Sequence, residues 1–129
     1  MPLYVISSYR SIHEQIDLVL AVFENSREGV FIASDNKKIS SVNKAFVKIT
    51  GFSEVEVRGR SPLWSINEDE EKVNEIWKKI DQSGGWEGKI SRRHKNGDFL
   101  TEWINVISIK NSQGIITHYI GLIHLYKQR

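Results

Sequence analysis

The residues that could do chemistry in this chain are few, and their spacing matches no catalytic or metal-binding pattern. The four histidines, His13, His94, His118 and His124, are not spaced as metal ligands, so we expect them at the surface or in turns. The acidic run Glu68–Glu71 could attract a divalent cation, but we favour its complementing a helix dipole. The absence of cysteine excludes disulfides, thiolate metal sites, a cysteine nucleophile and a cysteinyl cofactor adduct. We therefore expect the chain not to be an enzyme.

Length and composition indicate one soluble domain. The chain has 129 residues, of which 40% are hydrophobic and 26% charged, values that favour a globular protein over a disordered one. A formal net charge of +2 is too small to indicate nucleic acid or an anionic membrane as a partner. The longest apolar run, Leu18–Phe23, is far shorter than a membrane-spanning helix, and the chain does not start like a secretory signal. We expect a cytoplasmic protein without membrane insertion.

The elements that must position any site begin with a helix over Tyr9–Asn25. Its apolar seam repeats at intervals of three and four residues, through Tyr9, Ile12, Ile16, Val19 and Phe23. Two heptads are too few for a coiled coil that is stable alone. The seam therefore packs either on its own domain or on a second copy, and the sequence leaves both open.

The rest of the chain reads as a hairpin, short helices, one longer helix and three strands. Asn43 should cap a short helix ended by Gly51, and Ser53 and Glu56 have the spacing of a capping box. This order predicts an α+β fold, with helices on one face of an antiparallel sheet. The predicted ranges are strands 29–34 and 38–42, helix 67–82, and strands 86–93, 99–109 and 115–125.

Short motifs along residues 24–123 resemble those of one known family, the PAS sensor domains. They are Asp35, Val42–Phe46, Thr50–Ser53, Glu56–Gly59, Pro62, Gly85–Gly88, Arg92–Gly97 and Gly114–Gly121. The resemblance implies the PAS fold, a five-stranded antiparallel sheet with short helices and one longer helix on one face. It also implies a division into an N-terminal flanking amphipathic helix, residues 1–25, and a PAS domain, residues 26–126.

Among PAS domains, this sequence looks like the modules of bacterial multidomain signalling proteins. Many such modules precede cyclic-di-GMP synthesis or hydrolysis domains (GGDEF, EAL) or histidine kinases. The resemblance thus implies a sensory and dimerisation module that passes a signal to an effector domain in cis or to a signalling partner. Leu125-Tyr126 stands where the family usually has an Asp-Ile-Thr ending, so the connection to the output departs from the pattern.

The resemblance argues against some cofactors and identifies none, so the cofactor is unknown. Light-oxygen-voltage relatives need a cysteine and hold flavin through amides, whereas the corresponding positions here look like Trp86, Arg92 and Ile123, so flavin photochemistry is excluded. Haem with an axial histidine on the longer helix is not expected, because residues 67–82 contain none. Redox relatives with non-covalent FAD share the Trp77 and Trp86 pattern, so an FAD-binding redox sensor is one alternative. A ligand-free interaction scaffold is the other.

Strand alternation and the resemblance together indicate which residues line, or simply fill, the interior. Ser108 and Tyr119 would be polar handles for a small ligand, Gly121 would leave room beneath the helices, and Glu102 would lie at the margin. The candidate ligand-binding residues are Phe46, Trp64, Ile66, Trp77, Ile80, Trp86, Ile104, Val106, Ser108, Tyr119, Gly121 and Ile123.

The opposite face of the sheet is too apolar to remain exposed to water. It includes Trp103, Ile107, Ile120 and Leu122, and the N-terminal helix is the available cover, in cis or across a homodimer. The family also often pairs an acidic residue of the short helix with a basic residue at the strand turn. The matching residues are Glu56 with Lys95, or with Arg93 as the alternative partner.

Overall fold

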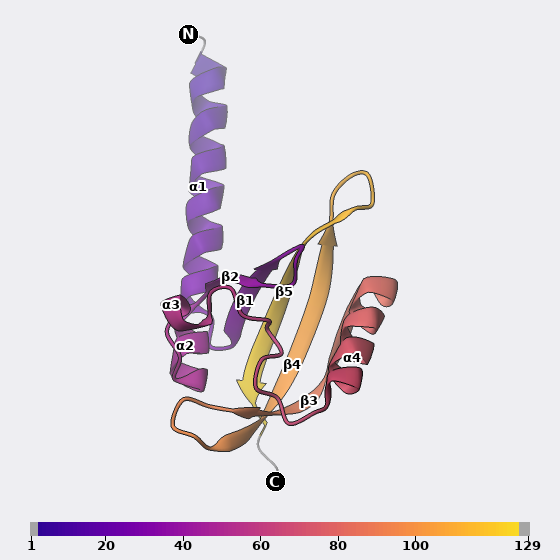
Figure 1. Cartoon of the computed structure of the whole chain (residues 1–129). Coiled ribbons are helices and arrows are strands. Elements are labelled where there is room, and N and C mark those ends of the chain that lie inside the picture. Colours follow the sequence, from indigo (N-terminus) through magenta and orange to yellow (C-terminus); the bar gives the residue numbers. More distant parts are fainter. Residues whose placement is uncertain (1–2, 127–129) are drawn as a thin grey trace.

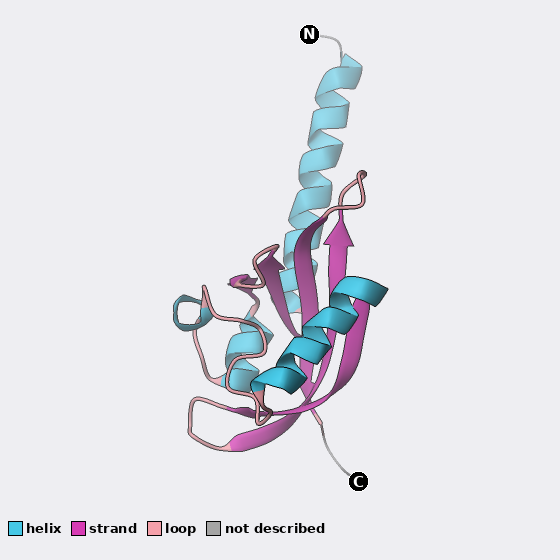
Figure 2. Ribbon diagram, turned by 45° about the vertical axis from the view of Figure 1, so that its right-hand side comes forward, coloured by secondary structure: helices cyan, strands magenta, loops and turns pink. Residues whose placement is uncertain are grey.

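A computed structural model of the chain describes residues 3–126, with side chains from residue 14 onward. Five antiparallel strands form one sheet, the other helices lie over one of its faces, and the N-terminal helix extends away from this body (Figures 1 and 2). The elements are α1 (Leu3–Asn25), β1 (Gly29–Ser34), β2 (Ile39–Val42), α2 (Lys44–Thr50), α3 (Glu54–Val57), α4 (Glu70–Ser83), β3 (Gly85–Arg93), β4 (Phe99–Lys110) and β5 (Ile116–Leu125). The predicted α+β class and element order are confirmed.

The strands lie in the order β2-β1-β5-β4-β3, so the last strand is the middle of the sheet. Gly29, the first residue of β1, pairs with Ile123 near the end of β5. Val106 of β4 pairs with Gly121 on one side and with Trp86 of β3 on the other. The chain therefore enters and leaves the sheet on neighbouring strands.

The longest helix of the body starts later than predicted. The sequence pattern placed its start at Asn67, whereas α4 begins at Glu70. Asp69 is the N-cap, because its carboxylate accepts the Lys72 backbone N–H at 2.8 Å. The Asn67 backbone N–H instead donates to the Ser91 carbonyl at 2.7 Å, which ties the preceding loop to β3. The acidic side chains of the first turn face the positive end of the helix dipole, as expected.

The N-terminal helix leaves the outer face of its own sheet uncovered. Its last turn lies against α2, and the rest extends beyond the body (Figure 1). Ile16 and Val19 of the predicted seam are 52% and 67% exposed, and Phe23 is half-buried. The side chains predicted for the first half of the seam, Tyr9 and Ile12, lie outside the described ones. Among residues 3–126, no helix is both long and apolar enough to cross a membrane.

One buried amide joins this helix to the body. Asn43, 1% exposed, donates through Nδ2 to the carbonyls of Phe23 at 2.8 Å and Glu28 at 3.1 Å. Its Oδ1 accepts the backbone N–H groups of Val30 at 2.8 Å and Phe46 at 3.0 Å. The expected N-cap of α2 is confirmed, and the same side chain holds the end of α1 and the start of β1.

We expect Asn43→Ser to cost about 1–3 kcal/mol of the free energy of unfolding. Serine still caps α2, but it cannot satisfy the carbonyls of Phe23 and Glu28. Chemical denaturation measures the loss, and amide hydrogen exchange should rise at Val30. The matched control is Asp69→Ser, which exchanges one capping residue for another at an exposed site. Equal, small losses in both variants would contradict a joining role for Asn43.

Candidate functional site

The structure brings the candidate ligand-binding residues together between the sheet and the helices. Phe46, Trp77, Ile80, Ile104, Val106, Tyr119, Gly121 and Ile123 are buried, and Trp64, Ile66, Trp86 and Ser108 are half-buried. All but Gly121 and Ser108 belong to, or pack against, one hydrophobic cluster. Ring centroids lie 5.9 Å apart for Phe46 and Trp64 and 5.2 Å apart for Trp77 and Tyr119.

At Gly121 the interior is filled by an aromatic ring. A Cβ placed on Gly121 would lie 1.9 Å from Cζ of Phe31, a residue of β1 with no exposed surface. The glycine therefore leaves room for a side chain of the protein. This packing also bears on flavin, because a planar ring over Gly121 would have to displace Phe31. The side chains at this point do not fit that cofactor.

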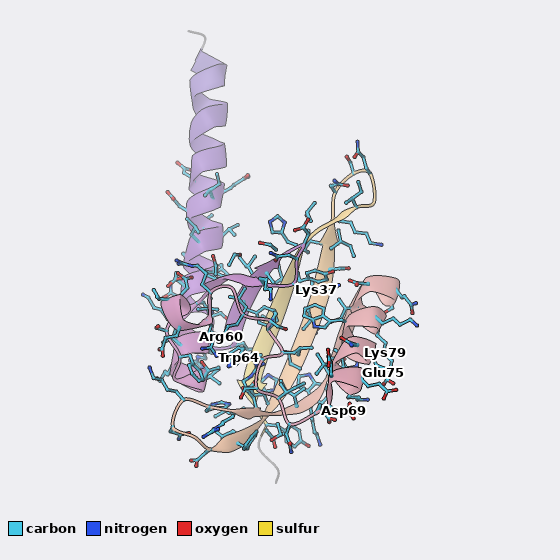
Figure 3. All side chains as sticks on the ribbon, in the orientation of Figure 1. Lys37, Arg60, Trp64, Asp69, Glu75 and Lys79 are labelled. Carbon is cyan, nitrogen blue, oxygen red and sulfur yellow. The ribbon has the colours of Figure 1, made fainter. Side chains whose placement is uncertain are left out.

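The two polar handles expected for a ligand bond to other protein groups. Tyr119 Oη donates to Asp81 Oδ1 on α4 at 2.5 Å, and Ser108 Oγ donates to the Gly84 carbonyl at 3.4 Å. Lys37 joins the first pair, with its Nζ 2.9 Å from Asp81 Oδ2 and 5.9 Å from the centroid of the Tyr119 ring. Figure 3 shows Lys37 in the turn between β1 and β2. These contacts hold that turn against α4.

Both acids of this contact have displaced pKa values. Burial, together with the hydrogen bond to Asp81, raises the pKa of Tyr119 well above its usual value. Burial would also raise the pKa of Asp81, but the Tyr119 hydrogen bond and the Lys37 charge outweigh it and lower that pKa. The carboxylate therefore stays ionised and the phenol stays protonated, which is the arrangement that the hydrogen bond needs.

A buried charged cluster, consisting of Arg92, His94 and Glu102, corrects two of the sequence-based expectations. Glu102 does not lie at the margin, since it has no exposed surface, and His94, which begins the turn before β4, is only 4% exposed rather than at the surface. Arg92 Nε lies 3.1 Å from both Glu102 carboxylate oxygens, and His94 Nε2 lies 2.8 Å from Oε2. His94 Nδ1 lies 2.8 Å from the Ile49 carbonyl at the end of α2.

The cluster also holds the loop between α3 and α4, in which Trp64 lies (Figure 3). Arg92 Nη1 donates to the Trp64 carbonyl at 3.1 Å, and the guanidinium carbon lies 4.1 Å from the centroid of the indole ring. Burial favours the neutral form of Glu102, but the Arg92 charge and the His94 hydrogen bond outweigh it and lower the pKa of Glu102. The buried pair is therefore ionised.

Strand alternation carried a signal for this cluster that sequence reasoning missed. Arg92 stands two residues after the buried Ile90, and Glu102 stands two residues before the buried Ile104, so both occupy inward positions. Ile90 pairs with Glu102 across β3 and β4, which places the two charges close together. A buried charge is costly unless it is paired. An inward-facing arginine on one strand therefore predicts an inward-facing glutamate on the neighbouring strand as its partner.

The expected ionic contact between the short helix and the strand turn is confirmed. Lys95 Nζ lies 2.8 Å and 2.7 Å from the two Glu56 carboxylate oxygens, so Lys95, rather than Arg93, is the partner. The Lys95 hydrogen bond is the main reason why the pKa of Glu56 falls to about 2. Glu56 also completes the predicted capping box with Ser53. The contact is solvent-exposed, and its role is to fix the turn beside α3.

Within the part of the chain that the structure describes, no group of three or more His, Cys, Asp or Glu residues is placed to hold a metal ion.

Comparison with known proteins places residues 17–125 on a family model described as the PAS fold. A human protein, the high affinity cAMP-specific and IBMX-insensitive 3',5'-cyclic phosphodiesterase 8A, is 27% identical over 110 residues, which are 83% of this chain and 13% of that protein. The nitrogen fixation regulatory protein of Klebsiella pneumoniae is 23% identical over 107 residues, 81% of this chain and 22% of that protein. The chain thus spans less than a quarter of either relative.

Two solved structures have a similar fold. The PAS domain of a protein from Colwellia psychrerythraea matches with a TM-score of 0.79 at 16% identity, over 88% of this chain and 98% of that one. An RNA-binding light-oxygen-voltage receptor matches with a TM-score of 0.77 at 19% identity, over 84% of this chain and 32% of that one.

Proposed function

Because this chain belongs to the PAS family, we propose that it is a sensory module that passes a change in its packing to an effector domain and catalyses no reaction itself. It is a PAS sensor domain with relatives among signalling proteins. We assign the sensory body to residues 26–126 and the connection between copies to the helix in residues 1–25. The resemblance to bacterial modules that precede GGDEF, EAL or histidine kinase domains supports an effector in cis and a cytoplasmic setting.

The packing at Gly121 is the observation that carries this proposal. The Phe31 ring lies where a side chain at Gly121 would be, and Tyr119 and Ser108 bond to protein groups, which supports sensing through side-chain packing. The residues proposed for ligand binding would then form the sensing core, and a ligand would have to displace Phe31. Native mass spectrometry and the visible spectrum of the purified protein test this. A stoichiometric small molecule or flavin absorbance would overturn sensing by packing alone.

We propose a homodimer in which α1 and the outer face of the sheet lie in the interface. Ile16, Val19 and Leu20 are 52–67% exposed and, with Gln15, line a hollow of about 260 Å³ on the helix. On the sheet, Ile107 and Leu122 are 44% and 37% exposed and line a second hollow, of about 170 Å³. Specific interfaces bury about 1,600 Å² in total, which the apolar seam of a 23-residue amphipathic helix with a sheet patch can supply.

We expect Ile16→Asp to raise the dissociation constant of the dimer by about tenfold or more, because the interface would then bury an unpaired carboxylate. Sedimentation velocity over a concentration series measures this constant. Glu14→Gln, a change on the same helix but off the seam, should leave it unchanged. A wild-type protein that sediments as a monomer at high micromolar concentration would reject the dimer.

A further inference from the structure

The two ring nitrogens of His94 both face acceptors. Nδ1 lies 2.8 Å from the Ile49 carbonyl oxygen, which can only accept, so Nδ1 carries a hydrogen. Nε2 lies 2.8 Å from Glu102 Oε2, so one further proton must lie between these two atoms. Whichever of the two atoms holds it, its loss leaves a lone pair facing a carboxylate oxygen. One of the two hydrogen bonds of His94 then has to break.

The surroundings place this proton on the imidazole ring. Arg92 on β3 holds both Glu102 oxygens, which keeps the carboxylate ionised and able only to accept. Two charged residues, Lys95 and Asp98, lie in the turn after His94. The Lys95 ammonium is bound by Glu56 of α3, and the Asp98 backbone carbonyl accepts the His94 N–H at 2.8 Å. The titratable side chains of α2 itself, Lys44 and Lys48, are exposed. Glu102 is thus the carboxylate that bonds to the ring.

We propose that the His94–Glu102 contact is a proton-operated switch: loss of one proton makes His94 give up one of its two bonds, and whichever bond breaks, the link from Glu102 through His94 to the end of α2 is lost. That helix has seven residues, with the Ile49 carbonyl bound by His94 near one end and the Asn43 cap, which holds the end of α1, at the other. A change at the cluster therefore reaches the α1 junction through one short helix. The proposal adds a proton as an input to the sensory role, and it does not depend on a small molecule binding the interior.

The effect on stability depends on the same proton. Where the folded cluster and the unfolded chain hold different numbers of protons, the free energy of unfolding changes with pH. A variant that lacks the imidazole ring lacks the contribution of this cluster to that change.

Two measurements on the whole chain test the switch. In the first, the ring ¹⁵N shifts of His94 and the carbonyl ¹³C shift of Ile49 are followed by NMR from pH 5.5 to 9. We expect both ring nitrogens to be protonated at the acid end, and the Ile49 shift to change with the midpoint of the ring titration. A ring with a single proton at pH 5.5, or an Ile49 shift independent of the ring, overturns the proposal.

In the second measurement, urea denaturation from pH 6 to 9 compares the wild type with His94→Gln. Glutamine still offers Glu102 a donor but cannot titrate, so the stability of this variant should change less with pH than that of the wild type. His118→Gln and His124→Gln, at exposed positions, should keep the pH dependence of the wild type. An unchanged slope in His94→Gln overturns the switch, and if that variant does not fold, the wild-type NMR titration decides. Sedimentation at pH 7 tests the dimer separately, so the two proposals can fail independently.

Discussion

Glu102→Leu should remove about 3–5 kcal/mol of the free energy of unfolding, the typical cost of breaking a buried ion pair from one side. The variant leaves the guanidinium of Arg92, which has no exposed surface, without its counter-charge. It also removes the acceptor of His94 Nε2. Urea denaturation at pH 7, with the midpoint and the slope fitted separately, measures the loss.

The double variant Arg92→Met/Glu102→Leu is the matched control, because it removes both charges and fills their space with apolar side chains. Buried ion pairs replaced by apolar side chains are often neutral or stabilising, so the double variant should be more stable than Glu102→Leu alone. Glu56→Gln tests an exposed carboxylate and should have a much smaller effect. A loss below about 1 kcal/mol for Glu102→Leu would show that water, or a rearrangement of the side chains, solvates the unpaired Arg92 guanidinium.

Gly121→Ala should cost about 1–3 kcal/mol, and Gly121→Leu at least as much, because both overpack the interior. The added Cβ would lie 1.9 Å from Cζ and 2.1 Å from Cε2 of Phe31, so the ring must move. Phe31 also contacts Phe46 at a centroid distance of 6.3 Å, which spreads the disturbance to α2. Thermal and chemical denaturation measure the loss.

Removing the ring should restore part of this loss. In a double-mutant cycle, Phe31→Leu should make Gly121→Ala less costly than it is in the wild type, since leucine leaves space where the ring was. If Gly121→Leu is tolerated and a small molecule that copurifies with the wild type is lost, the interior is a ligand cavity instead.

Most of the fold could be predicted from the sequence because it depends on local signals. Asn43, Gly51 and Ser53 act at the helix ends where their residue types indicated. The start of α4 was placed too early because the segment before it is polar and reads as helix, whereas its backbone pairs with β3. A periodic pattern does not show that a neighbouring strand competes for the same N–H groups.

The candidate site was only half predictable, for a different reason. Alternation along β4 and β5 identified the buried apolar positions, because burial follows the strand period. It could not show that the Phe31 ring occupies the space at Gly121, which depends on the pairing of β1 with β5. Glu102 was placed at the margin, because Arg92 was considered only as a flavin position and not as its partner. Which side chains meet at such inward positions depends on how the strands pair in the tertiary structure.

Because Gly29 pairs with Ile123, the chain enters and leaves the sheet at neighbouring positions. The residue that follows the α1 junction and the residue near the end of β5 are separated by one strand spacing, roughly 4.8 Å. A segment joined at each of these points is anchored at almost the same place on the sheet. A tilt of the sheet then displaces both anchors together and changes mainly the angle between the two segments. This geometry favours a rotation between the two segments, rather than a separation of them, as the form that an output would take.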